Sequence, residues 1–142
     1  MRFKKLHPDA ITPTRGTPLS GGLDLYATER HVIRPGQNKK IGTGVAFEIP
    51  EGYVGLVSVR SSMGDAGICL ANDLGTIDAD YRGEVMLNLH NRWYPLSNSY
   101  VIAPGQRIGQ MVVVPTPLFE LEEVAELSET TRGTGGFGST GK

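Results

Sequence analysis

The chain is short of cysteine, of net charge and of long apolar runs. Cys69 is its only cysteine, which excludes an internal disulfide framework and, between apolar neighbours, indicates a buried structural thiol in a reducing compartment. Lysine and arginine total 14 against 15 acidic residues, so there is no net field to hold a polyanion such as DNA. We therefore expect no nucleic-acid partner, and a small anionic ligand held by a few local groups.

Membrane spans and metal clusters are also missing from the sequence. No apolar stretch approaches the roughly 18 residues of a membrane span, and the N-terminus lacks the apolar core of a signal peptide. His7, His31 and His90 are scattered, without the spacing of a transition-metal cluster. These absences predict a cytoplasmic protein with no membrane association and no direct metal ligands.

Long amphipathic helices are absent too. The 19 glycines and 9 prolines separate short apolar stretches, and residues 45–49 and 85–90 alternate with a period of two. Residues 108–114 are nearly all apolar, as in a buried strand. The segment 121–127 fits either a short helix or a strand, and we favour a strand. The pattern predicts an all-β sandwich or barrel of jelly-roll type, in a chain sized for one domain.

Glycine is abundant at the C-terminal end of the sequence. Residues 132–142 contain five glycines, with Arg132 and Ser139 as side-chain donors and Phe137 as the one large flat surface. Glycines allow backbone N–H groups to converge on an anion, so we expect this segment to become ordered around a nucleotide.

The same segment sets the expected domain organisation. From residue 128 onward the chain is polar and glycine-rich, with no apolar face to dock on its own body. We expect residues 1–127 to form a β-rich catalytic domain. Residues 128–142 would form a flexible arm that closes the site of a neighbouring subunit.

An acidic turn at residues 75–84 is the second informative segment. It places Asp78, Asp80 and Tyr81 between two apolar strands, and loops on rigid scaffolds often carry chemistry. One of the two carboxylates could act as a general base. The alternative is a solvated turn that uses aspartate and glycine only to bend the chain.

Hydrogen-bond donors gather in two further places. Arg60, Ser61 and Ser62 follow a predicted strand and offer a guanidinium and two hydroxyls to phosphate oxygens. Gln110 lies on another predicted strand. Together with Asp78 and the C-terminal segment, these groups predict a polyphosphate site with a base and no resident metal.

These residues make the chain resemble the trimeric deoxyuridine triphosphate nucleotidohydrolases (dUTPases) over essentially its full length. Five motifs occur in the family's order, at residues 20–25, 60–62, 72–83, 104–110 and 132–141. The resemblance implies a distorted jelly-roll, or β-clip, barrel that forms a homotrimer. Each of three sites at subunit contacts would be closed by a C-terminal arm exchanged from another subunit.

The resemblance also implies roles for individual residues. Asp78 would be the general base that directs water to the α-phosphorus of dUTP, releasing dUMP and pyrophosphate, and Tyr81 would pack under the deoxyribose. Mg²⁺ would be carried by the substrate phosphates, with Asp24 supporting it only through water. The uracil edge would be read by Asn72, Thr76, Ile77 and Met86. The phosphates and the closed base would be held by Arg60, Ser61, Ser62, Gln110, Arg132, Phe137, Gly138 and Ser139.

Three other functions fit parts of the sequence. A dCTP deaminase shares the fold, but it needs a glutamate in the strand after the acidic turn, where Asn88 stands and cannot shuttle the proton. A nucleotide-sensing trimer would keep the pocket without turnover, and binding without pyrophosphate release would identify it. A purely structural β-sandwich would leave the clustered donors unexplained.

Overall fold

The computed structural model describes residues 1–92 and 99–136, and within them the chain is almost entirely β. The strands are β1 (Arg2–Lys5), β2 (Leu23–Tyr26), β3 (His31–Ile33), β4 (Asn38–Gly42), β5 (Val45–Glu48), β6 (Tyr53–Val59), β7 (Ile68–Leu70), β8 (Gly75–Ile77), β9 (Met86–Asn91), β10 (Tyr100–Ile102) and β11 (Arg107–Pro115). One short helix, α1 (Ser61–Asp65), follows β6 in the described part. The predicted all-β class is confirmed.

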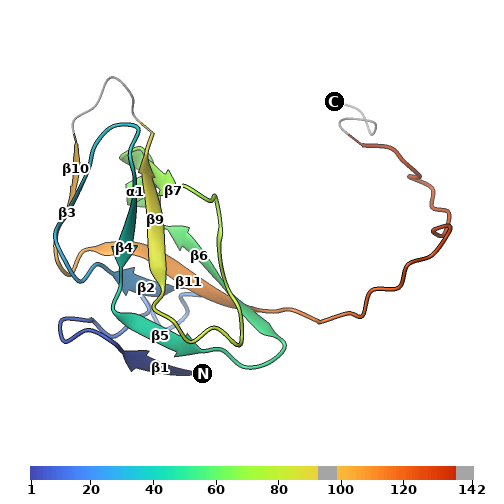
Figure 1. Ribbon diagram of the computed structural model, residues 1–142, viewed down its shortest axis with the longest axis horizontal. Helices are drawn as coiled ribbons and strands as arrows, with labels where there is room; N and C mark the ends of the chain where they lie inside the picture. The colour runs from blue at the N-terminus through green and yellow to red at the C-terminus, as the bar shows by residue number, and fades with distance from the viewer. Residues whose placement is uncertain (93–98, 137–142) are drawn as a thin grey trace.

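The strands form two larger sheets and two pairs, all antiparallel (Figure 1). The four-stranded sheet has the order β2-β11-β6-β8, and the three-stranded sheet has the order β4-β9-β7. The pairs are β1-β5 and β10-β3. Because β8 and β9 belong to different sheets, the acidic turn between them connects the two sheets.

The core is built from the apolar positions that the sequence pattern indicates. In β9, Leu87 and Leu89 are fully buried and Met86 is exposed, as the alternation predicts. In β11, Ile108 and Met111 are fully buried. These side chains join one cluster drawn from both sheets, and each large aliphatic group contributes about 1.5–3 kcal/mol when removed from water. This packing fixes the strands on which the acidic turn is mounted.

The C-terminal part leaves this body. β11 ends at Pro115, and residues 116–136 form no helix or strand and run away from the sheets (Figure 1). Leu118, Leu121 and Leu127 are 80%, 98% and 87% exposed. The strand expected at 121–127 is therefore wrong for the single chain, because a strand needs a hydrogen-bonding edge and the described body pairs none with this segment. The division at residue 127 stays a prediction.

No helix in the described ranges is long and apolar enough to cross a membrane. The helix α1 has 5 residues, whereas a bilayer-spanning helix needs about 20.

Candidate active site

The acidic turn has a defined internal geometry. The Tyr81 N–H donates to the carbonyl oxygen of Asp78 at 3.1 Å. The Arg82 guanidinium donates to the carbonyl oxygens of Ala79, at 2.6 Å, and of Tyr81, at 3.0 Å. Arg82 thus binds the turn from inside, and the positions of Asp78 and Tyr81 relative to each other are set by the turn itself.

A cavity of about 310 Å³ opens beside this turn. Its walls include five residues predicted from the sequence, namely Thr76, Ile77, Asp78, Tyr81 and Met86. Three residues that the sequence analysis did not assign to the site complete the walls, namely Lys40, Glu84 and Asn88. We call this space the hairpin cavity. It brings the predicted base together with the predicted groups for uracil and deoxyribose.

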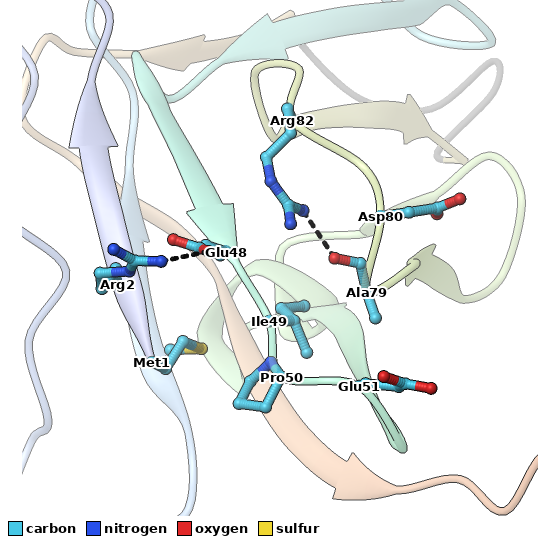
Figure 2. Close-up of a pocket in the computed structure, with 9 residues that line it drawn as sticks. All are labelled: Met1, Arg2, Glu48, Ile49, Pro50, Glu51, Ala79, Asp80 and Arg82. Carbon is cyan, nitrogen blue, oxygen red and sulfur yellow. Dashed lines mark hydrogen bonds and ion pairs between the residues drawn. The ribbon is translucent and has the colours of Figure 1, made fainter.

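The two carboxylates of the turn have different surroundings. Asp78 lines the hairpin cavity, and Asp80 does not. Both carboxylates line another cavity beside Glu51, and Asp80 also lines one with Arg82. There Figure 2 shows Arg82 turned towards the Ala79 carbonyl and the Asp80 carboxylate pointing away from it. Of the two carboxylates, Asp78 is thus the one placed beside Tyr81 in the hairpin cavity.

Asn72 is not among the walls of the hairpin cavity. Its Nδ2 donates to the carbonyl oxygen of Leu74 at 3.0 Å, and the Leu74 N–H donates back to the Asn72 carbonyl oxygen at 2.6 Å. Between them Asp73 has a φ of 59°, in the left-handed region. In the single chain, Asn72 therefore shapes the tight turn that leads into β8.

A second group of predicted residues surrounds Asp24 on β2. Asp24 is 6% exposed, and its two carboxylate oxygens face two guanidinium groups. Arg60 Nε lies 3.3 Å from Oδ1, and Arg107 Nη1 lies 3.2 Å from Oδ2. A nearly buried carboxylate requires such partners. Asp24 therefore orients both arginines, and Arg107 is a cation of this group that the sequence analysis did not single out.

Gln110 joins the same group through the sheet. On β11 it lies opposite Asp24 on one side and Ser58 on the other. A Cβ atom at Gly22 would collide with the Gln110 side chain, so glycine at that position makes room for it. This close approach explains Gly22, whereas nothing lies within 4 Å of a Cβ atom at Gly21.

The helix α1 presents the two serines. Arg60 is its N-cap in extended conformation, and Ser61 and Ser62 are exposed in its first turn. Met63 is 1% exposed and anchors the helix, with Tyr100 donating its hydroxyl to the Met63 sulfur at 3.4 Å. The buried methionine keeps both hydroxyls at the surface. The sequence analysis placed this segment at the end of a strand and did not predict the helix.

The two groups lie at opposite ends of β6. Ile77 pairs with Gly55 near one end, whereas Arg60 follows the other end, five residues further along, or about 16 Å at about 3.3 Å per residue. Arg60, Ser61, Ser62 and Gln110 are absent from the walls of the hairpin cavity. One chain therefore does not bring the predicted base to its own phosphate donors.

The arm forms the third group. Arg132 Nε donates to the carbonyl oxygen of Gly135 at 2.9 Å, a contact within the arm. The Gly133 N–H donates to Thr130, also within the arm. The predicted residues Phe137, Gly138 and Ser139 lie outside the described residues.

Comparison with known proteins gives one family for this set of motifs. The dUTPase family model matches residues 9–141. The chain belongs to the dUTPase family. It is 44% identical to the deoxyuridine 5'-triphosphate nucleotidohydrolase of Nautilia profundicola, over 100% of this chain and 99% of that protein. It is 47% identical to the protein of the same name from Anaplasma marginale, over 91% of this chain and 88% of that protein.

Solved dUTPase structures share the fold of this chain. A variant of the Staphylococcus bacteriophage 80alpha dUTPase with dUpNHpp is 32% identical, with a TM-score of 0.92 over 99% of this chain and 98% of that chain. A dUTPase variant from phage phi11 of S. aureus, whose structure reveals the coordination of a structural Mg(II) ion, is 28% identical, with a TM-score of 0.82 over 90% of this chain and 98% of that chain. These neighbours confirm the jelly-roll type of fold predicted from the sequence.

Within this dUTPase fold, the sequence analysis missed residues whose partners are far away in the chain. Arg107 is 83 positions from Asp24, and Glu84 is 40 positions from the backbone group that it binds. Arg107 lies inside the fourth motif, so its neighbours could have indicated it. Glu84 belongs to the acidic turn, but nothing in the local pattern indicates its partner Gly44. Lys40 reaches the cavity through the pairing of β4 with the distant strand β9.

Proposed function

We propose that this chain hydrolyses dUTP to dUMP and pyrophosphate. One observation carries the proposal: Asp78 lines the hairpin cavity together with Tyr81, Met86 and two residues of β8, Thr76 and Ile77. A base next to a nucleoside-sized pocket suits attack on the phosphorus nearest the sugar. Such an enzyme limits uracil incorporation into DNA and supplies dUMP for dTMP synthesis, and we infer that it works in the cytoplasm.

The proposed reaction is an in-line displacement by water. Asp78 accepts a proton from the water that attacks the α-phosphorus, and pyrophosphate leaves from the opposite side. A positioned base contributes about 10² to 10⁴-fold to such a step. The larger share comes from groups that hold and neutralise the phosphates, because phosphoryl transfer needs positioning and charge more than covalent chemistry.

Those phosphate-binding groups would come from other copies of the chain. A base acts within about 3 Å of the atom it deprotonates, and Arg60 of the same chain is about 16 Å further along β6 from the residue opposite Ile77. We therefore propose a homotrimer in which one chain supplies Asp78, a second supplies Arg60, Ser61, Ser62 and Gln110, and the arm of another chain closes the site. The unpaired apolar residues of the segment 116–127 fit the same assembly.

The residues present fit a magnesium ion that arrives with the substrate. The described residues contain no group of three or more His, Cys, Asp or Glu side chains that could hold a metal, and both oxygens of Asp24 face arginines. Mg²⁺ commonly keeps several waters and binds substrate phosphates. When bound, it would neutralise phosphate charge, and Asp24 would contact its water shell rather than the ion.

Selectivity for uracil would come from the strands that form the cavity. The backbone groups of Thr76 and Ile77 would present donors and acceptors that match uracil, and cytosine, with the reverse pattern, would leave buried polar groups unpaired. Thymine would be rejected by contact of its C5 methyl group with the cavity wall. Tyr81 under the sugar would leave no room for a 2′-hydroxyl.

Pyrophosphate release from dUTP, dTTP, dCTP and UTP tests the proposal. We expect appreciable release only from dUTP and only with Mg²⁺, and chelation of the metal should abolish it. Binding of dUTP without release would indicate a sensor instead. Ammonia release from dCTP would indicate a deaminase, and either result would overturn the proposed function.

A further inference from the structure

Glu84 forms a contact that no assigned role explains. Its carboxylate Oε1 accepts a hydrogen bond from the backbone N–H of Gly44 at 2.7 Å. Gly44 lies in the turn between β4 and β5, 40 positions away in the sequence. Glu84 also lines the hairpin cavity, so this bond joins the wall of the cavity to a different part of the body.

The same residue holds Tyr81. The Tyr81 hydroxyl donates to the backbone carbonyl oxygen of Glu84 at 3.0 Å. A side chain at Gly83 would collide with the Tyr81 ring, so the ring lies directly against the turn. The orientation of Tyr81 therefore depends on where the backbone of Glu84 is held.

The turn between β4 and β5 is shaped to receive the carboxylate. A Cβ atom at Gly42, the last residue of β4, would lie 2.6 Å from Glu84 Oε1, so a side chain there would displace the carboxylate from this position. Next to this bond, Thr43 Oγ1 donates to the Val85 carbonyl oxygen at 2.6 Å, and the Val85 N–H donates to Val45 at 2.8 Å. These two contacts do not involve the side chain of Glu84 and would remain without it, so removing the carboxylate should loosen the turn rather than unfold it.

We propose that Glu84 is a positioning residue for substrate binding: by holding the turn on Gly44, it fixes Tyr81 against the sugar. The inference rests on the proposed function, and it extends that function to a residue outside the motif positions assigned above. Glu84 acts through Tyr81 and the backbone. Its loss should therefore raise KM for dUTP and leave kcat nearly unchanged.

Two substitutions separate the effect of side-chain length at Glu84 from the effect of its charge. Glu84→Gln keeps the length and the Oε1 acceptor but removes the charge. Glu84→Asp keeps the charge but is shorter by one methylene, so it cannot reach the Gly44 N–H without moving the backbone. We expect KM near the native value for Glu84→Gln, and a rise of about tenfold for Glu84→Asp, a factor that corresponds to about 1.4 kcal/mol.

A matched control is available on β5. Glu48 also forms one contact, with the exposed Arg2 at 2.5 Å, and that pair lies outside the hairpin cavity. Surface pairs of this kind contribute little. Glu48→Asp should leave KM and kcat unchanged.

A double-mutant cycle tests the route through Tyr81. Tyr81→Phe removes the hydroxyl that binds the Glu84 carbonyl oxygen. If both changes release the same restraint, KM for the double variant Glu84→Asp/Tyr81→Phe rises less than the product of the two single effects.

The outcomes distinguish the two proposals. If the native chain does not hydrolyse dUTP, the proposed function fails. If the native chain is active and Glu84→Asp, folded by its melting curve, keeps the native KM, the positioning role fails. The positioning role also fails if Glu84→Gln raises KM as much as Glu84→Asp does, because the charge of the side chain rather than its length would then matter.

Discussion

The acidic turn and the C-terminal arm differ in how much of their structure one chain supplies. The turn is mounted between two sheets, and besides the local contact of Arg82 with Ala79 it is bound to a distant part of the body through Glu84 and Gly44. In the described part of the arm, residues 128–136, the hydrogen bonds are local, such as that of Arg132 with Gly135, and the leucines of the segment 116–127 that leads into the arm are exposed. Both carry motifs of one family. A site residue can therefore be preorganised in its own chain or depend on another copy for its position.

The difference predicts two kinds of functional loss. Changes in the turn should alter chemistry or affinity inside a cavity that already exists. Changes in the arm should act on closure, and only in the assembled protein. Two substitutions and one truncation, from the largest expected effect to the smallest, test this distinction.

The largest effect is expected at the base. Asp78→Asn should lower kcat for pyrophosphate release by about 10² to 10⁴-fold, because the amide cannot accept the proton of the attacking water. The melting temperature should stay within a few degrees of the native value, since Asp78 is exposed.

The matched control for the base lies in the same turn. Asp80→Asn makes the same change two residues away, outside the hairpin cavity, and should keep most of the activity. Equal losses in the two variants would contradict the assignment of Asp78.

Removal of the arm should have the next largest effect. A chain ending at Ser128 should lose about 10²-fold or more in turnover, the scale of removing preorganised donors from a charged transition state. Its thermal unfolding should be nearly unchanged, because the hydrogen bonds described for residues 130–135 all stay within the arm. A large fall in melting temperature would mean that the arm is part of the body.

The smallest effect is expected in the segment that leads into the arm. Leu121 is 98% exposed in the single chain, so Leu121→Ser would cost nothing there. If a second chain covers it, the change should weaken the assembly by up to about 1.5–3 kcal/mol. The dependence of melting temperature on protein concentration measures the strength of the assembly. Glu122→Ser, a change at the neighbouring residue, is the matched control. If the two variants show the same melting temperatures, no second chain covers this segment.

The sequence predicts best what depends on local pattern. The alternation in β9 and the apolar run of β11 predict both strands because each has one buried face in its own chain. The chemistry of Asp78 and Tyr81 could be read from their types and their turn. The five residues of α1 are too few to show a period, and only the buried Met63 reveals what holds them.

Long-range contacts could not be predicted from spacing. Glu84 and Gly44 meet because β4 and β9 pair, and Arg107 reaches Asp24 because β11 and β2 pair. The apolar residues at 121–127, which fit a helix or a strand, led to a wrong expectation of a strand in the single chain, because an apolar pattern shows that burial is favourable without showing which chain provides it. The hairpin cavity was thus largely predictable, whereas its attachment to the body was not.

Complementation between two inactive variants tests the central claim most directly. Asp78→Asn keeps its arm, and the chain ending at Ser128 keeps its base; the two are unfolded together in equal amounts, refolded, and assayed for pyrophosphate release from dUTP. If the turn and the arm of each site come from different chains, random assembly should restore about a quarter of native activity. About half of the chains that supply the turn carry Asp78, and about half of the chains that supply the arm carry an intact arm. Activity no higher than that of the variants refolded separately would mean that each chain closes its own site, and would contradict the account.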